Sequence, residues 1–192
     1  MVFDAPDGPI EAVHDVAILA LGGASWAKLG SDGAWSGIVE GAGVATAPFK
    51  PANCGFEVGW REHVGAKFAG TPMKSIALSF GGRTVRGEAM VSETGIEGGA
   101  VYALSSDLRD AIDATGSARL IIDLKPDNDL ARLAARFEDG RQGDTVTSRL
   151  RKVGSPPVSI AVLREGVRSL PQDPAALAGA IKAVPIMLTG TG

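Results

Sequence analysis

The chain has 192 residues, of which 45% are hydrophobic and 21% are charged, with 19 basic and 22 acidic side chains. This composition is typical of a folded globular protein and not of a disordered one, and the slightly acidic balance disfavours a nucleic-acid partner. Cys54 is the single cysteine, so a secreted scaffold built on internal disulfides is not implied.

The first 47 residues show a hairpin signal and one strong apolar run. Asp7-Gly8 predicts a hairpin within residues 1–13. Val16–Leu21 is a continuous β-prone run that ends at Gly22-Gly23, a pattern typical of a buried strand in an α/β sheet. A Gly- and Ser-rich loop follows, and weak helical spacing occupies residues 34–43.

From residue 48 the pattern becomes one of short strands separated by turns, which predicts a small β-barrel or sandwich. Gly81-Gly82 is a two-residue hairpin signal between two of these strands. A helix interrupts the series, with Ser105 or Ser106 as its N-cap and Gly116 as its stop. The expected strands cover residues 55–60, 75–80, 84–91 and 118–124.

After residue 124 the hydrophobic period is helical. Asp127 or Asn128 can cap a helix whose apolar face is formed by Leu130, Leu133, Ala134 and Phe137. Asp173-Pro174 is a clear helix start, with Asp at the N-cap and Pro in the first helical position. Further helices are expected over residues 147–153 and 158–167, and the last 9 residues begin with a strand-like run, 184–188.

Motifs for common chemistries are incomplete. No G-x-G-x-x-G sequence follows a strand, so the usual dinucleotide-phosphate motif is missing. Ser25 and Lys28 have S-x-x-K spacing, but the partner motifs of a serine hydrolase are absent, which makes a polar loop the better interpretation. His14 and His63 lack metal-ligand spacing, and we expect no metal site.

Two features remain open to interpretation. The stretch Gly95–Ser105 is a Gly-rich turn that leads into a helix, and such a helix start could face an anion or a flavin edge. A simple turn into a packed helix explains it equally well. For Cys54 we expect a small buried residue in preference to a nucleophile.

Taken together, several stretches resemble the NAD(P)/FAD-dependent oxidoreductases, a flavoprotein family that includes aminoacetone-oxidase-like members. The stretches occur in the family's order and extend over nearly the whole chain. They are Leu19–Trp26, Gly30–Trp35, Pro51–Phe56, Gly87-Glu88, Gly95–Ser105 and Ile181–Pro185.

The resemblance implies a mixed α+β and α/β fold: a remnant of a Rossmann-type FAD domain, followed by a small antiparallel β-barrel with a helical insert. Residues 1–47 would be part of the FAD domain, 48–124 with 184–192 the barrel, and 125–183 the helical insert. Because the family's N-terminal G-x-G-x-x-G is not found, the chain looks like the middle portion of such a protein.

The resemblance also implies FAD as the cofactor of the complete protein, with NAD(P) as a possible second one. The expected flavin contacts are Ala20, Gly22, Gly23 and Ser25, followed by Gly98, Gly99 and Tyr102. Leu21 stands where related flavoproteins have Thr, so a backbone contact would survive there and a hydroxyl contact would not. The catalytic residues stay unknown.

The implied activity is that of an FAD-dependent oxidoreductase acting on an unidentified small-molecule substrate, and this chain alone is expected to be inactive. The alternative is a barrel-plus-helical binding module that works without flavin. The acidic N-terminus and the lack of a long apolar segment predict a cytoplasmic protein with no membrane partner, and leave the oligomeric state open.

Overall fold

The computed structural model describes residues 2–61, 64–139 and 143–192. Within it the chain divides into two compact units, Met1–Lys50 and Pro51–Gly192. No helix in the described ranges has both the length and the apolar character that a bilayer crossing requires.

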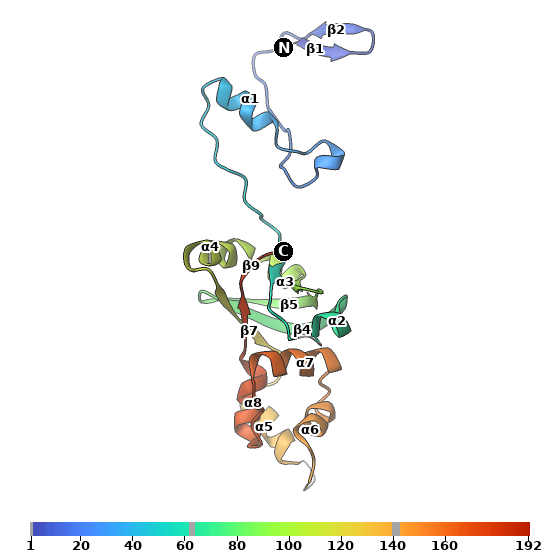
Figure 1. The fold of residues 1–192 in the computed structure, drawn as a ribbon, viewed down its shortest axis with the longest axis vertical. Coiled ribbons are helices and arrows are strands. Elements are labelled where there is room, and N and C mark those ends of the chain that lie inside the picture. Colours follow the sequence, from blue (N-terminus) through green and yellow to red (C-terminus); the bar gives the residue numbers. More distant parts are fainter. Residues whose placement is uncertain (1, 62–63, 140–142) are drawn as a thin grey trace. The chain divides into compact units, whose positions relative to one another are not determined.

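The first unit begins with the hairpin that Asp7-Gly8 predicts. β1 (Val2–Ala5) pairs antiparallel with β2 (Gly8–Glu11), and Gly8 has a φ of +112°, which favours glycine at this turn. A single turn of 3₁₀ helix, η1 (Ala27–Leu29), and the helix α1 (Trp35–Gly41) follow (Figure 1). α1 confirms the helical spacing of residues 34–43.

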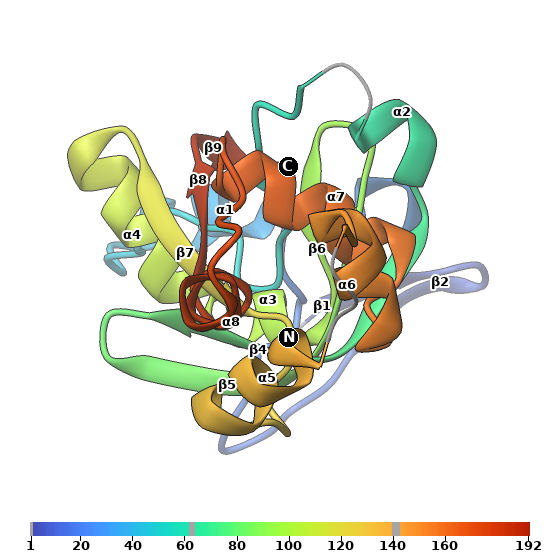
Figure 2. The ribbon, with the colours of Figure 1, turned by 90° about the horizontal axis from the view of Figure 1, so that it is seen from below.

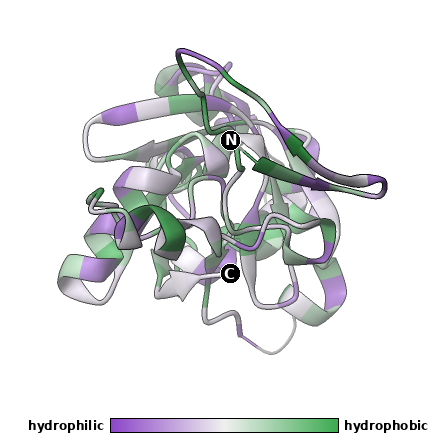
Figure 3. Ribbon diagram, turned by 90° about the horizontal axis from the view of Figure 1, so that it is seen from above, coloured by the Kyte–Doolittle hydropathy of each residue, from purple (hydrophilic) through white to green (hydrophobic). Residues whose placement is uncertain are grey.

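The strand predicted over Val16–Leu21 is wrong. These residues have no regular secondary structure and are exposed, with 89% of Ile18 accessible. A buried parallel strand needs neighbouring strands on both sides, and β1–β2 is the one sheet described within the first 50 residues. The Rossmann-type sheet is therefore not formed within the described residues of this unit. Exposed apolar residues occur along the first unit, and Figure 3 shows apolar stretches in green near the N-terminus.

The second unit is built on one seven-stranded antiparallel sheet in the order β8-β7-β4-β5-β6-β3-β9. Its outermost strands, β8 and β9, are separated along the chain by Thr189 alone, whose N–H donates to the Glu57 carbonyl. The two edges of the sheet therefore meet, and the sheet closes into a barrel. The strands are β3 (Phe56–Glu57), β4 (Thr71–Phe80), β5 (Arg83–Val91), β6 (Gly95–Glu97), β7 (Ala118–Asp123), β8 (Val184–Leu188) and β9 (Gly190–Thr191).

The antiparallel pairing confirms the mixed α+β class, and the Gly81-Gly82 hairpin joins β4 to β5 as predicted. Among the residues that the structure describes, the barrel carries three helices: α2 (Val64–Phe68), α3 (Gly99–Tyr102) and α4 (Ser105–Thr115). α4 ends at Gly116 with a left-handed φ of +79°, which is the predicted glycine stop.

Neither serine caps α4, because Leu104 occupies the N-cap position. Ser105 is instead buried, and its hydroxyl lies 3.2 Å from the Cys54 carbonyl oxygen and 3.3 Å from that of Val101. The Cys54 N–H also points to this hydroxyl, at 3.4 Å. Ser105 thus attaches the segment before β3 to α4, and Cys54 is buried as predicted.

Removal of this hydroxyl should destabilise the second unit. We expect Ser105→Ala to lower the free energy of unfolding by about 1–3 kcal/mol, since it leaves buried backbone groups of Cys54 without a partner. Urea denaturation followed by circular dichroism measures the change. Ser106→Ala, at the exposed next position of the same helix, should change stability by less than about 0.5 kcal/mol. Equal effects of the two substitutions would contradict the assignment.

In the described part of the chain, four helices are inserted between the paired strands β7 and β8: α5 (Leu130–Glu138), α6 (Val146–Lys152), α7 (Pro157–Gly166) and α8 (Pro174–Lys182). They gather at one end of the barrel (Figures 1 and 2). Lys182, the last residue of α8, connects the end of this helical insert to its beginning. Its ammonium lies 2.7 Å from the Asp123 carboxylate and donates to the carbonyls of Lys125 and Asn128. Buried side chains of barrel and insert form one continuous hydrophobic cluster.

The helix caps of the insert are partly as predicted. Asp173 caps α8 by accepting the Ala176 N–H, as expected. The N-cap of α5 is Asp129, which accepts the Arg132 N–H, and not Asp127 or Asn128. The carboxylate of Asp127 pairs instead with Arg86 of β5, a contact across the sequence that local spacing cannot indicate.

Candidate functional site

The first group of expected flavin contacts lies in a loop that folds back on itself. The Trp35 indole N–H donates to the Gly22 carbonyl at 3.1 Å, and the Ser31 hydroxyl donates to the Gly23 carbonyl at 2.8 Å. Gly22 has a φ of +77°, and a Cβ there would lie 2.7 Å from Ser31 Oγ. The loop's own packing therefore requires glycine at position 22.

Other contacts complete this loop. Trp26 and Ser31 exchange backbone hydrogen bonds, both 3.1 Å long. The Trp35 ring meets Phe49 edge-on, with ring centroids 5.8 Å apart. Ser25 is exposed, and its hydroxyl forms no hydrogen bond with Lys28 or with any other residue that the structure describes. This arrangement gives no support to a serine nucleophile activated by Lys28.

Gly23 differs from Gly22. A Cβ at Gly23 would meet no atom within 4 Å, and its φ is not in the left-handed region. Packing within the chain therefore does not require glycine at position 23, and the backbone there is open to close approach by another molecule. Ala20 lies three residues earlier, in the exposed segment without regular secondary structure.

The second group of expected contacts is the turn from β6 into α3. Gly98 has a φ of +114°, and a Cβ there would lie 3.1 Å from Ala89 Cα and 3.2 Å from the Glu88 carbonyl oxygen of β5. The Gly98 carbonyl accepts the N–H groups of Val101 and Tyr102, both at 2.9 Å. Close packing on β5 thus explains Gly98, in agreement with the interpretation of this stretch as a turn into a packed helix.

Gly99 and Tyr102 are less constrained. A Cβ at Gly99 would meet no atom within 4 Å, as at Gly23. The Tyr102 hydroxyl lies 3.5 Å from a Glu97 carboxylate oxygen, so the phenol reaches back along its own turn. The structure brings Gly98, Gly99 and Tyr102 together in the second unit, whereas Ala20, Gly22, Gly23 and Ser25 belong to the first.

Metal ligands do not gather in the described ranges, where no three His, Cys, Asp or Glu side chains form a cluster suited to a cation. His63 lies outside the described residues. Asp123 and Asp127 are each paired with a cation, and Asp129 caps a helix. The acids near residue 125 thus have structural partners.

The closed barrel and the helical insert between two of its paired strands lie within a part of the chain that matches a known family model. The family model described as "HI0933-like protein barrel and H2TH domain" covers residues 50–192. The chain belongs to this family. A search of curated proteins found no match. The HI0933-like proteins are a family of FAD-dependent oxidoreductase-like proteins, which agrees with the resemblance at this coarse level.

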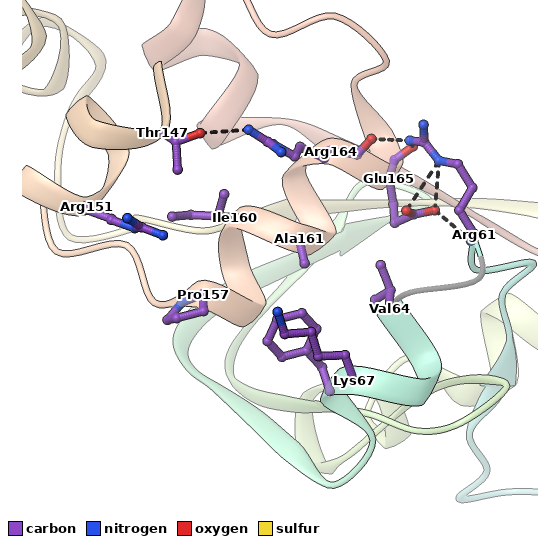
Figure 4. A pocket seen from close by; sticks show the side chains of 11 residues that line it. Arg61, Val64, Lys67, Thr147, Arg151, Pro157, Ile160, Ala161, Arg164 and Glu165 are labelled. Carbon is purple, nitrogen blue, oxygen red and sulfur yellow. Dashed lines mark hydrogen bonds and ion pairs between the residues drawn. The ribbon is translucent and has the colours of Figure 1, made fainter. Parts of the chain in front are cut away.

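A further site, which the sequence did not predict, lies between the barrel and the helical insert of this HI0933-like domain. Helices α2, α6 and α7 surround a cavity of about 410 Å³ (Figure 4). Val64 and Lys67 extend from α2 toward Ala161 and Pro157 of α7. The lining residues are Arg61, Val64, Lys67, Phe68, Thr147, Arg151, Pro157, Ile160, Ala161, Arg164 and Glu165.

One wall of the cavity is held by an ion pair. Arg61 Nε lies 3.3 Å from a Glu165 carboxylate oxygen, and the Arg61 guanidinium also donates to the Arg164 carbonyl. These contacts fix the segment before α2 to the last turn of α7, where a cation is favoured by the helix dipole. Because Arg61 and Glu165 are more than 100 residues apart, no local pattern could place them together.

Proposed function

We propose that this chain supplies the barrel, the helical insert and a flavin-facing glycine loop of an FAD-dependent oxidoreductase that acts on a small-molecule substrate. The match of residues 50–192 to the HI0933-like family carries the proposal. In the division that we propose, residues 1–47 belong to an FAD domain, 48–124 with 184–192 form the barrel, and 125–183 form the insert. The position of the four helices between β7 and β8 supports this division.

The residues of this chain fit part of an FAD site. Internal packing does not require glycine at position 23 of the first unit or at position 99 of the second, and a planar ring could approach the backbone closely at either position. Neither the sequence nor the part of the chain that the structure describes contains a strand, G-x-G-x-x-G and helix that could hold the pyrophosphate. We therefore propose Ala20, Gly22, Gly23, Ser25, Gly98, Gly99 and Tyr102 as neighbours of the flavin, with the pyrophosphate held by residues outside this sequence.

When bound, the flavin would supply the redox chemistry. The chain's own residues would position the flavin. The hydrogen bonds from Ser31 and Trp35 fix the carbonyls of Gly22 and Gly23, which gives the open backbone beside them a defined shape. The packing of Gly98 on β5 sets the direction in which α3 begins.

The coding DNA on both sides of this sequence tests the proposal most directly. An in-frame segment that encodes a strand, G-x-G-x-x-G and a helix is the expected result, because FAD binding needs that phosphate site. Stop codons close to both ends of the sequence would overturn it.

Flavin binding by the chain itself gives a second test and a prediction. After incubation with FAD and gel filtration, we expect flavin absorbance far below one FAD per chain, since open glycines alone do not hold a dinucleotide. A stoichiometric yellow complex would contradict the claim that the phosphate site lies elsewhere.

A binding module that works without flavin is the second candidate. The observation in its favour is the second unit itself, which has its own closed barrel and its own hydrophobic cluster. A monodisperse chain that unfolds in one cooperative step would favour this candidate. Aggregation through the exposed apolar residues of the first unit would favour the flavoprotein fragment.

A further inference from the structure

The cavity between α2, α6 and α7 combines an apolar interior with an excess of positive charge. Val64 and Ile160 are buried residues of its lining, and Phe68 is half-buried beside them. Among the lining residues that the structure describes, four side chains are cationic and Glu165 is the one acid. With about 410 Å³ the cavity falls in the size range of small-molecule sites.

Three of the four cations have no carboxylate partner among the residues that the structure describes. Arg61 is already paired with Glu165. Arg164 donates to the neutral Thr147 hydroxyl at 2.7 Å, and the Lys67 ammonium lies 5.6 Å from the centre of the Phe68 ring. Arg151 has no side-chain partner in the described ranges. Electrostatic repulsion between cationic side chains around one cavity is unfavourable unless a bound anion offsets it.

Each of these three residues, taken alone, resembles an ordinary exposed cation. Their arrangement around one cavity does not have this explanation. A solvated lysine or arginine needs no cavity, and exposed charges usually contribute little by themselves. Here Lys67 comes from the barrel and Arg151 and Arg164 from two helices of the insert, and all three line the same apolar hollow (Figure 4). Arg164 is further oriented by its bond to Thr147.

We propose that this cavity binds a small organic anion, a phosphate or carboxylate attached to an apolar group. The anionic head lies against Arg151, Arg164 and Lys67, because guanidinium groups pair with both kinds of anion in two-pronged geometry. The apolar part lies against Val64, Phe68 and Ile160. This site goes beyond the proposed flavin chemistry and does not depend on it.

Isothermal titration of the purified 192-residue chain with phenyl phosphate tests the proposal. We expect saturable binding at one site, about tenfold or more tighter than the binding of inorganic phosphate, which lacks the apolar group, or of benzyl alcohol, which lacks the charge. Arg151→Glu should weaken the binding of phenyl phosphate by about tenfold or more, because it replaces an attractive charge by a repulsive one. The variant should fold normally, since Arg151 is exposed.

Arg132→Glu is the matched control. Arg132 is an exposed cation on α5 of the same insert and lies outside the cavity, so its reversal changes the net charge equally but should leave the affinity within about twofold. Absence of saturable binding, or an equal loss in both variants, would overturn the proposal. Binding of a DNA duplex that depends on Arg151, without binding of phenyl phosphate, would also overturn it in favour of a nucleic-acid surface.

Discussion

Gly95→Ala is expected to lower the free energy of unfolding of the barrel by about 3 kcal/mol or more. A Cβ at this position would lie 1.9 Å from the Phe56 carbonyl oxygen and 2.8 Å from the carbonyl carbon. Both atoms belong to the backbone of the neighbouring strand β3, so no side chain can turn aside to make room. The strands must separate, and overpacking of this kind is among the most destabilising of single substitutions.

The separation would break more than one contact. Gly95 stands opposite Glu57 in the β3–β6 pair, and its carbonyl accepts the Trp60 indole N–H at 3.1 Å and the Ser92 N–H at 2.8 Å. β3 also pairs with β9, so its displacement disturbs the point at which the sheet closes. Loss of these hydrogen bonds in a buried region adds to the steric cost.

Urea denaturation of the variant against the wild-type chain measures the effect. The matched control is Gly99→Ala, four positions along the same segment, where a Cβ would meet open space and φ is ordinary. Because Gly99 begins α3, alanine there should be neutral or should stabilise by up to about 1 kcal/mol. A Gly95→Ala variant as stable as the wild type would show that β3 and β6 are not packed as described.

The barrel and the helical insert were largely predictable because their signals are local. Alternation with glycine turns marks the strands on either side of Gly81-Gly82, and the i, i+3, i+4, i+7 spacing marks α5. The stop at Gly116 and the start at Asp173-Pro174 depend only on neighbours in sequence. Closure of the sheet, in contrast, depends on β9 meeting β3, a pairing that no local pattern contains.

Two wrong predictions of local structure have one physical cause. The residue or strand that would determine the local structure is distant in the sequence or is missing from the described part of the first unit. Val16–Leu21 has the composition of a buried strand, but a strand forms only against neighbours, and the described residues of the first unit provide none for it. Ser105 has the composition of a helix cap, yet its partner Cys54 lies 51 positions away and draws it into the core. A missing tertiary partner decides the first case, and a tertiary contact with a distant residue decides the second.

Prediction of the site was limited in the same way. Paired glycines indicated ligand contacts at Gly22 and Gly98, and the structure explains both of these by internal packing while leaving Gly23 and Gly99 open. The cationic cavity depends on residues that only the fold brings together, since Lys67 and Arg151 belong to different parts of the chain. The type of a residue indicates which interactions its side chain can form. The neighbours that the fold supplies determine which of these interactions it forms.

Phe137→Ala is expected to lower the free energy of unfolding of the second unit by about 3–5 kcal/mol. Phe137 lies on α5 of the helical insert, is only 1% exposed and is among the largest fully buried side chains of the cluster that barrel and insert share. Its removal forfeits the transfer free energy of an aromatic ring and leaves a cavity that closely packed helices fill incompletely. Leu130→Ala on the same helix, at a half-exposed position, should cost about 1 kcal/mol or less.

Because the hydrophobic cluster is continuous, the loss of stability in Phe137→Ala should appear in the barrel as well as in the insert. With Trp26 and Trp35 replaced by Phe in all variants, Trp60 next to β3 is the one remaining tryptophan and reports on the barrel, while far-ultraviolet circular dichroism reports chiefly on the helices. In Phe137→Ala we expect both signals to shift to lower urea together, as a single cooperative unit requires. Early loss of the helical signal with an unchanged Trp60 transition would instead divide the domain into two independent cores, and the cavity between α2 and α7 would then lie between parts that open separately.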